Sequence, residues 1–328
     1  MSYTIRAMLP AICLTLILPF VPPLLAADPV PSKDAPPADV PVEPQVLPSR
    51  SQEDALALER QLPQAEQQQL QAGDESFLAL WKPANSDDPK GAVIVIPGAG
   101  ETADWPNAVG PLRRKLPDVG WASLSLTMPD APDDGVIARA PEPIPAAGDA
   151  ATDKATPKDA ANKTTDPTAT AEAEAAATAA RATADAEQAK SYAERIFTRI
   201  ESAVAFAQQN KARSIVLVGH GSGAYWAARF MSEKSSPAVQ KLVMITAQET
   251  GKDTPSLLQI LPTLKVATAD FVDKDRPVSR KQAQERLDAS KRVKGAKFTQ
   301  ITLNTVPGNS ATEQEQLTRR VRGWLESQ

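Results

Sequence analysis

The stretch of sequence that decides the fold is IVLVGHGSGAYWAA, residues 215–228. Its first four residues form a continuous apolar run, which is typical of a strand buried on both faces of a parallel sheet. Glycines at every second position, Gly219, Gly221 and Gly223, then predict a tight turn. The residues from Ala224 onward predict a helix. The stretch therefore predicts a sharp corner between a buried strand and a helix.

This corner resembles the nucleophile elbow of the α/β-hydrolase family, in which a Gly-His-Ser-x-Gly run holds a serine on a strained turn. Gly219 and His220 match the first two positions and Gly223 matches the last, but Gly221 occupies the place of the nucleophile. Glycine there also relieves the backbone strain that a serine would bear. Ser222 comes one residue late. The resemblance implies that its backbone N–H serves an oxyanion hole, and we expect its hydroxyl to cap the helix.

The other parts of a serine–histidine mechanism are incomplete in this sequence. Such a mechanism needs an imidazole that takes and returns a proton, and the only histidine is His220, inside the elbow itself. The resemblance implies a histidine after the last strand, but residues 304–310 contain none. It also implies an acid after a late strand, where Asp270 is the best match. The candidates that remain for catalysis are Ser222 and Asp270.

A second glycine-containing turn, Pro97-Gly98-Ala99-Gly100, follows the apolar run 92–96. The resemblance implies that backbone N–H groups of this turn and of Ser222 converge on an anionic or carbonyl oxygen. We therefore expect an oxyanion-type cleft between this turn and the elbow. Its expected members are Gly219, His220, Gly221, Ser222, Gly223, Pro97, Gly98 and Ala99.

A narrower resemblance rests on three further stretches. Asp104-Trp105-Pro106, residues 219–224 and residues 319–325 are similar to those of an uncharacterised family of exported bacterial α/β-hydrolase-like proteins, a domain of unknown function. The resemblance covers residues 75–327 apart from an insert. It implies a fold, and it implies no established activity.

The pattern of apolar and polar residues on both sides of the elbow predicts an α/β protein. Short apolar runs alternate with amphipathic segments, which indicates a mostly parallel sheet of about six to eight strands flanked by helices. We expect strands at residues 77–81, 92–96, 121–126, 214–218, 241–246, 264–267 and 298–303. We expect helices at 52–71 with a break near Pro63, and at 104–116, 224–234, 257–260, 278–293 and 312–326.

Two segments depart from this alternation of apolar runs and amphipathic segments. Residues 28–51 are rich in Pro, Asp and Ser and predict a disordered linker before a domain that spans 52–328. A low-complexity insert at about 130–185 interrupts the domain, and it contains too few large apolar residues to form a core. The end of the insert is Ala- and Glu-rich and predicts a long helix from about Thr168 to Asn210. Two roles remain open for the insert. It could serve as a lid or partner-binding arm, but the sequence favours a tolerated surface segment without a function of its own.

The first 27 residues predict an export signal. Arg6 precedes an apolar run that ends at Ala26 and Ala27, where small residues suit cleavage. A membrane anchor is the alternative, but prolines near the end of the run disfavour a spanning helix. We therefore expect a periplasmic or secreted protein that meets the membrane only if this segment stays uncleaved. The single cysteine, Cys13, lies within the signal, so the mature chain has no thiol for disulfides or metals.

Composition excludes several classes of function. The formal net charge is −4, which gives no basic field for nucleic acid. One histidine and no mature cysteine argue against a zinc site, and we expect neither a metal nor a cofactor. An alternative remains open, because Gly219-x-Gly221-x-x-Ala224 also fits a dinucleotide-binding fingerprint, with Glu249 near the place of a ribose-binding acid.

The sequence favours a catalytically degenerate hydrolase scaffold that binds a cell-envelope, acyl or peptide ligand at the cleft beside Gly98, Gly221 and Ser222. The first alternative is a weak or atypical esterase that uses Ser222. The second is a Rossmann-type dinucleotide-binding protein.

Overall fold

The computed structural model describes residues 48–132 and 167–327, apart from 235, 252–253 and 307, and it describes only the backbone of 167–177. The predicted export signal 1–27, nearly all of the predicted linker and residues 133–166 of the predicted insert lie outside the described residues. No helix in the described ranges is both long and apolar enough to span a bilayer.

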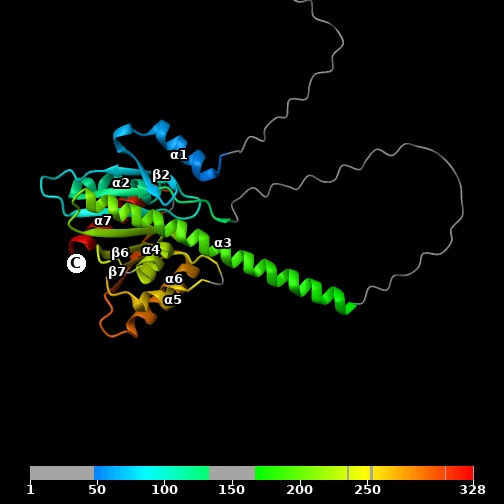
Figure 1. The fold of residues 1–328 in the computed structure, drawn as a ribbon. Coiled ribbons are helices and arrows are strands. Elements are labelled where there is room, and N and C mark those ends of the chain that lie inside the picture. Colours follow the sequence, from blue (N-terminus) through cyan, green and yellow to red (C-terminus); the bar gives the residue numbers. More distant parts are fainter. Residues whose placement is uncertain (1–47, 133–166, 235, 252–253, 307, 328) are drawn as a thin grey trace, which may run out of the picture. The chain divides into compact units, whose positions relative to one another are not determined.

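An eight-stranded sheet forms the centre of the protein (Figure 1), with the strand order β1-β2-β4-β3-β5-β6-β7-β8. β2 pairs antiparallel with both β1 and β4, and all other neighbouring strands are parallel. The predicted fold class, a mostly parallel sheet flanked by helices, is confirmed. The strands are β1 (Gln67–Ala72), β2 (Glu75–Lys82), β3 (Gly91–Ile96), β4 (Trp121–Leu126), β5 (Ile215–His220), β6 (Val239–Ile245), β7 (Ala267–Asp273) and β8 (Phe298–Leu303).

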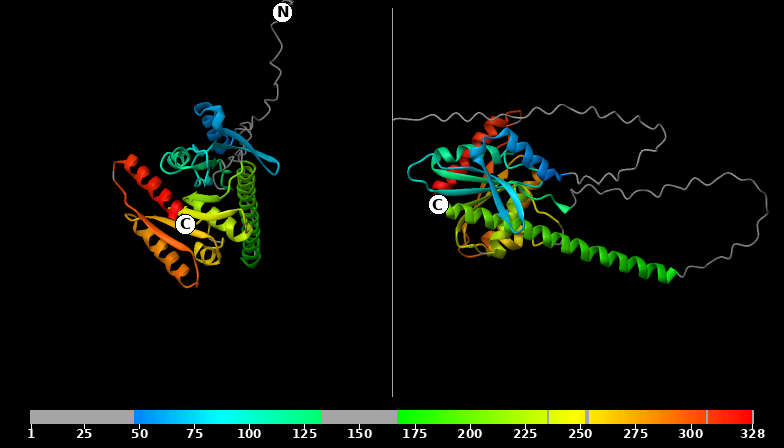
Figure 2. Two further views of the ribbon diagram at one scale, coloured as in Figure 1. Left: turned by 90° about the vertical axis from the view of Figure 1, so that its left-hand side faces the viewer. Right: turned by 45° about the horizontal axis from the view of Figure 1, so that its top comes forward.

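Helices cover both faces of this sheet. α2 (Val109–Lys115) and α7 (Ser310–Ser327) pack on one face, where they bury Leu112, Leu116, Val321 and Trp324. α3 (Pro167–Gln209), α4 (Ser222–Lys234) and α5 (Leu257–Ile260) cover the other face. α6 (Pro277–Lys291) packs against α5, β7 and β8. In the left view of Figure 2 the sheet lies between α7 and α3.

The central strands are buried because both of their faces carry apolar residues. Every residue of β3 and β4 is buried, and so are the first five residues of β5. Such double coverage is what a continuous apolar run predicts. β4 and β8 begin and end at the predicted residues, and the other predicted strands agree within a few residues except the one at 264–267.

The prediction of a strand at 264–267 was wrong, because β7 covers Ala267–Asp273. Asp270 interrupts the apolar run of this strand, so the sequence suggested that the strand had ended. The side chain is nevertheless fully buried in the middle of β7, where Arg286 of α6 pairs with it. A buried carboxylate is tolerated when it is paired and hydrogen-bonded in this way.

The N-terminal part also differs from its prediction. A helix was expected over 52–71, but α1 covers Arg50–Gln61 and the rest forms a short 3₁₀ turn and the Gln-rich strand β1. β1 is an edge strand, and Gly73 with φ +60° turns it back into β2. α1 begins two residues before the predicted start of the helix at 52, because Ser49 forms a capping box with Gln52.

The bounds of the long helix α3 differ by one residue at each end from those of the helix predicted from Thr168 to Asn210. Its C-terminal half buries Ala193, Ile196, Phe197, Ile200 and Ala203 in the core. Residues 178–191 are exposed, and this half of the helix extends away from the sheet (Figure 1). The helix predicted at 104–116 is shorter, since α2 starts only at Val109 after a series of turns.

Candidate functional site

The predicted corner between β5 and α4 is present. β5 ends at His220, Gly221 adopts a left-handed conformation with φ +55°, and α4 begins at Ser222. The backbone of Gly221 is held on both sides: its N–H donates to Ile245 O over 3.0 Å, and its carbonyl accepts from Gln248 N over 3.0 Å. The apex is therefore fixed against the loop that follows β6.

Two glycines of the elbow are required by close packing. A Cβ atom on Gly223 would lie 2.2 Å from the carbonyl oxygen of Ile96, and one on Gly219 would lie 2.4 Å from Cα of Ala224. No side chain fits at such distances. Gly219 and Gly223 therefore let α4 start directly against β5 and the end of β3.

Gly221 is different, because space for a side chain remains there. The nearest atom to a Cβ built on this residue is Cα of Gly98, at 3.9 Å. The only obstacle is the positive φ, which costs an ordinary residue about 1–2 kcal/mol. Packing therefore does not explain the missing side chain at the apex.

Ser222 lies beside the apex with its hydroxyl committed elsewhere. The backbone N–H of Ala99 donates a hydrogen bond to Ser222 Oγ over 2.7 Å, and the residue is buried. The hydroxyl thus ties α4 to the turn after β3, and the expectation that it caps its own helix was wrong. The helix begins close to this turn, within hydrogen-bond reach of the Ala99 N–H.

The only histidine also has a partner that the sequence did not reveal. His220 Nδ1 lies 2.7 Å and 2.8 Å from the two carboxylate oxygens of Glu101. Glu101 Oε2 accepts a second hydrogen bond, over 2.7 Å, from the backbone N–H of Gly98. His220 therefore hydrogen-bonds beside the turn. Glu101 follows the Gly98-Ala99-Gly100 turn directly, and this proximity was the one available sign of its role.

The two turns predicted to form an oxyanion-type cleft do come together. However, the N–H groups of Gly98 and Ala99 already donate to Glu101 and Ser222, which are side chains of the protein itself. An oxyanion hole requires donors that are free to meet the substrate oxygen. In this state of the protein, these two donors are not available to a ligand.

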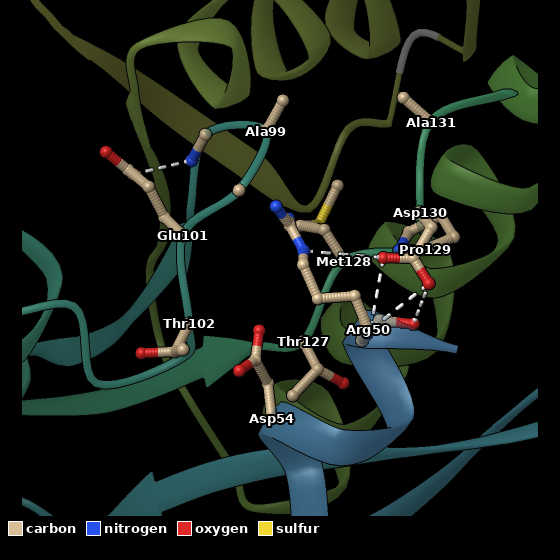
Figure 3. A pocket seen from close by; sticks show the side chains of 13 residues that line it. Arg50, Asp54, Ala99, Glu101, Thr102, Thr127, Met128, Pro129, Asp130 and Ala131 are labelled. Carbon is tan, nitrogen blue, oxygen red and sulfur yellow. Dashed lines mark hydrogen bonds and ion pairs between the residues drawn. The ribbon is translucent and has the colours of Figure 1, made fainter. Parts of the chain in front are cut away.

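The N-terminus of α1 closes the space beside this turn (Figure 3). Arg50, Ser51 and Asp54 of α1 face Gly98–Thr102 and residues 127–131 across a cavity of about 20 Å³. Such a cavity holds about one water molecule. The Arg50 guanidinium lies against Gly100, where an added Cβ would be 3.2 Å from its Nη1.

Asp130 holds α1 in this place. Ser51 donates to the Asp130 carboxylate from its backbone N–H over 3.1 Å and from its hydroxyl over 2.8 Å. Arg50 Nε lies 3.9 Å from the same carboxylate. Burial raises the pKa of Asp130, but the hydrogen bonds from Ser51 and the charge of Arg50 outweigh this and hold it below its ordinary value. Asp130 is therefore an anionic anchor for α1.

Asp270 does not occupy the place expected of a triad acid. It lies in mid-strand and is saturated by Arg286, which donates from Nε over 3.0 Å and from Nη2 over 3.2 Å, and by Gln300 Nε2 over 3.1 Å. Its role is to pair with Arg286 between the sheet and α6. The expectation failed because it rested on the wrong end for β7.

Two other acids stand at the carboxyl end of β7. Asp273, the last residue of β7, accepts a hydrogen bond from the Thr305 hydroxyl over 2.8 Å, and Asp275 accepts one from the Thr305 N–H over 3.0 Å. In a serine hydrolase an acid and a histidine meet after the late strands. Here a threonine takes the corresponding place beside Asp273, and it cannot act as a proton acceptor near neutral pH.

Glu249, the proposed ribose-binding acid of the dinucleotide alternative, accepts a hydrogen bond from Leu257 N at the start of α5 over 2.8 Å. This carboxylate therefore has a structural partner. Within the described ranges, His, Cys, Asp and Glu side chains form no group of three or more that suits a metal ion.

The stretches behind the narrower resemblance have packing roles. Asp104 pairs with Arg113, a guanidinium that is 1% exposed and also contacts Glu66. In the C-terminal stretch Val321, Trp324 and Leu325 are buried against the sheet. These residues support the fold around the site.

Comparison with solved structures shows the same fold. A provisionally assigned dienelactone hydrolase from Klebsiella pneumoniae has a TM-score of 0.51 and 13% identity, over 80% of this chain and 98% of that one. Est1E from Butyrivibrio proteoclasticus has a TM-score of 0.48 and 10% identity, over 80% and 99%. A dienelactone hydrolase from Anabaena variabilis has a TM-score of 0.48 and 13% identity, over 79% and 98%.

At these identities the likeness shows the fold alone, which is that of the α/β hydrolases. No curated protein matches the chain. One family model, described as a protein of unknown function (DUF3530), matches residues 9–327. Since this match spans nearly the whole sequence, the chain belongs to the DUF3530 family.

Proposed function

We propose that this protein is a catalytically degenerate α/β-hydrolase scaffold that binds an acyl, peptide or other cell-envelope ligand beside Gly98, Gly221 and Ser222. The observation that carries the proposal is the state of the elbow. Its apex is Gly221, and the neighbouring N–H groups of Gly98 and Ala99 are held by Glu101 and Ser222. The shape of a hydrolase site is present, while the nucleophile is missing and two of the expected oxyanion donors are occupied by side chains.

Binding at this cleft requires the N-terminus of α1 to move, because the present cavity admits about one water. The first turn of α1 is held there by Ser51 and Arg50, which contact Asp130. The rest of the helix is anchored separately by Leu58, which packs on Leu78 and Leu80. A ligand that displaces Arg50 from Gly100 would gain access to the elbow. This makes the attachment of α1 part of the proposed binding step.

A fluorophosphonate probe tests the absence of catalysis. We expect no labelling of the full chain and no hydrolysis of p-nitrophenyl butyrate, since this chemistry needs an activated serine. The variant Ser222→Ala is the control. Labelling of the wild type that disappears in Ser222→Ala would contradict the proposal.

Saturation-transfer NMR with p-nitrophenyl butyrate tests binding. We expect transfer to the intact ester without turnover, stronger in Asp130→Ala, in which the first turn of α1 is released. In Ala99→Trp, which fills the mouth of the cleft, we expect the transfer to disappear. An absence of transfer even in Asp130→Ala would contradict binding at the elbow.

An esterase that uses Ser222 is the second candidate, and one observation favours it. Glu101 holds His220 by Nδ1, as the acid of a triad holds its histidine. Against it stands the bond between Ser222 Oγ and Ala99 N. The probe experiment above decides between the two.

Export and location are part of the proposal. The apolar segment before Asp28 supports a cleaved signal and a periplasmic or secreted protein, with an envelope component as ligand or partner. Fractionation of cells that express the full chain tests this: we expect a shortened protein outside the cytoplasm. A full-length protein in the cytoplasmic fraction would contradict it.

A further inference from the structure

A second pocket lies next to α1. It has a volume of about 340 Å³ and opens between α1, the β1–β2 hairpin, the end of β4 and α3. This volume is within the range of small-molecule sites, whereas the cavity at the elbow is far below it. Ser51 and Thr127 line both spaces, so the first turn of α1 separates the pocket from the elbow cleft.

Most of the surface area that lines this pocket is apolar. Phe77 and Leu78 of β2 line it and are 4% and 2% exposed, and Ala55 and Leu56 of α1 line it from the other side. Leu56 is one of the few large apolar residues of the described chain that stay exposed, at 50%. An exposed leucine at the mouth of an apolar pocket suits an aliphatic ligand.

One wall of the pocket carries a buried cation, Arg199 of α3. Its side chain is 8% exposed and its guanidinium lies 5.0 Å from the centre of the Phe77 ring. Nη1 donates to the carbonyl oxygen of Thr127 over 2.7 Å. Nε is buried and has no hydrogen-bond partner among the described residues. A buried donor without a partner costs free energy. This nitrogen has almost no access to solvent even though the pocket is open, so the case for a ligand rests on the charge of the guanidinium.

The charge of Arg199 is only partly balanced. Among the described residues, Glu75 forms the ion pair with Arg199, at 3.3 Å, and Arg195 takes the same carboxylate at 2.9 Å. The charge of Asp130 adds a weaker favourable interaction. Two guanidinium groups thus share one carboxylate, which is itself 44% exposed. Burial lowers the pKa of Arg199, which reflects the cost of keeping this charge out of water. A further anion beside Arg199 would offset that cost.

We propose that this pocket binds a carboxylate with an aliphatic chain, such as a fatty acid, with its carboxylate at Arg199 and its chain along Ala55 and Leu56 of α1. A guanidinium pairs well with a carboxylate because its N–H groups match the two oxygens. Glu59 also lines the pocket, where its carboxylate accepts from Gln69 Nε2 over 2.7 Å. The negative charge of Glu59 repels the carboxylate of the ligand and so favours its placement at Arg199.

Isothermal titration of the full chain with decanoate, decanol and decyltrimethylammonium tests the charge preference. We expect decanoate to bind at least 10-fold more tightly than the other two. Equal binding of decanol would overturn recognition by Arg199, and no binding of decanoate would overturn the site.

Three variants locate the binding. Leu56→Glu puts a like charge at the mouth and should weaken decanoate binding at least 10-fold, whereas Leu258→Glu, at a leucine exposed outside the pocket, should not. Arg199→Met should remove the preference for decanoate over decanol. Equal effects of the two leucine variants would overturn the assignment even if Arg199→Met does not fold.

This inference does not depend on the function proposed for the elbow. Ala99→Trp, which blocks the elbow cleft, should leave decanoate binding unchanged, since Ala99 lines only the smaller cavity. Loss of decanoate binding in Ala99→Trp would place the carboxylate at the elbow and overturn the pocket assignment.

Discussion

The hydroxyl oxygen of Ser222 accepts a hydrogen bond from the backbone N–H of Ala99 over 2.7 Å. The one serine of the elbow is therefore a structural link between α4 and the turn after β3. This link uses a donor that a hydrolase would direct at its substrate.

Ser222→Ala should destabilise the protein by about 1 kcal/mol, the net value of one such hydrogen bond. Urea unfolding followed by tryptophan fluorescence measures the change. Ser232→Ala, which removes only a partly exposed hydroxyl contact to Thr263, is the control and should stay within about 0.5 kcal/mol. A neutral Ser222→Ala would mean that the bond does not hold the turn.

Gly221→Ser should fold, because a Cβ has 3.9 Å of space there, and should lose about 1–2 kcal/mol to the positive φ. Gly73→Ser has nearly the same φ and no atom near its Cβ, so its loss should be similar. Neither variant should hydrolyse p-nitrophenyl butyrate efficiently, since no histidine stands after β8. Efficient turnover by Gly221→Ser would show that His220 serves as base.

Gly223→Ala should prevent stable folding or cost several kcal/mol, because its Cβ would lie 2.2 Å from the Ile96 carbonyl oxygen. The matched change is Gly323→Ala in α7, where no atom lies within 4 Å. There, alanine should stabilise the helix by about 0.5–1 kcal/mol. Thermal unfolding of both variants checks the opposite signs.

Asp270→Ala should cost about 3–5 kcal/mol, since it leaves the buried Arg286 guanidinium without its carboxylate. The double variant Asp270→Leu with Arg286→Met should recover most of this loss. Asp88→Ala breaks an exposed pair with Arg213 and should cost no more than about 1 kcal/mol. Denaturant unfolding that shows equal losses for Asp270→Ala and Asp88→Ala would contradict the buried role.

The attachment of α1 should weaken in acid. The pKa of Asp130 is lowered in the folded protein, so its contribution to stability is present above the ordinary value of 3.8 and is lost as the pH falls below it. The amide resonance of Ser51 should therefore titrate with a midpoint below 3.8. Asp130→Asn should abolish this titration. A midpoint at or above 3.8 would mean that Ser51 does not stabilise the carboxylate.

Local pattern was enough to predict the central strands of the sheet and the elbow. The apolar runs of β3 and β5 and the spacing of Gly219, Gly221 and Gly223 depend on neighbours within a few residues. Steric limits on glycine turns and the burial of apolar runs both act between residues a few positions apart. They can therefore be recognised directly in the sequence. For the same reason, the sequence alone shows that Gly221 leaves the apex of the elbow without a side chain.

What escaped prediction depends on partners far away in the sequence. Asp270 appeared to end a strand, but Arg286, sixteen residues later, neutralises it inside one. Ser51 binds Asp130 from seventy-nine residues away, and Glu101 meets His220 across one hundred and nineteen. Pairings of side chains at such separations follow from the folded geometry and leave no local pattern.

The connection from β4 to α3 gives this scaffold room to diversify. The buried half of α3 is fixed by Ile196, Phe197 and Ile200 regardless of how many residues precede it, and the entropy of closing a longer connection grows only slowly with its length. Segments of different size can therefore be exchanged at this point in evolution, or by an engineer, without disturbing the sheet.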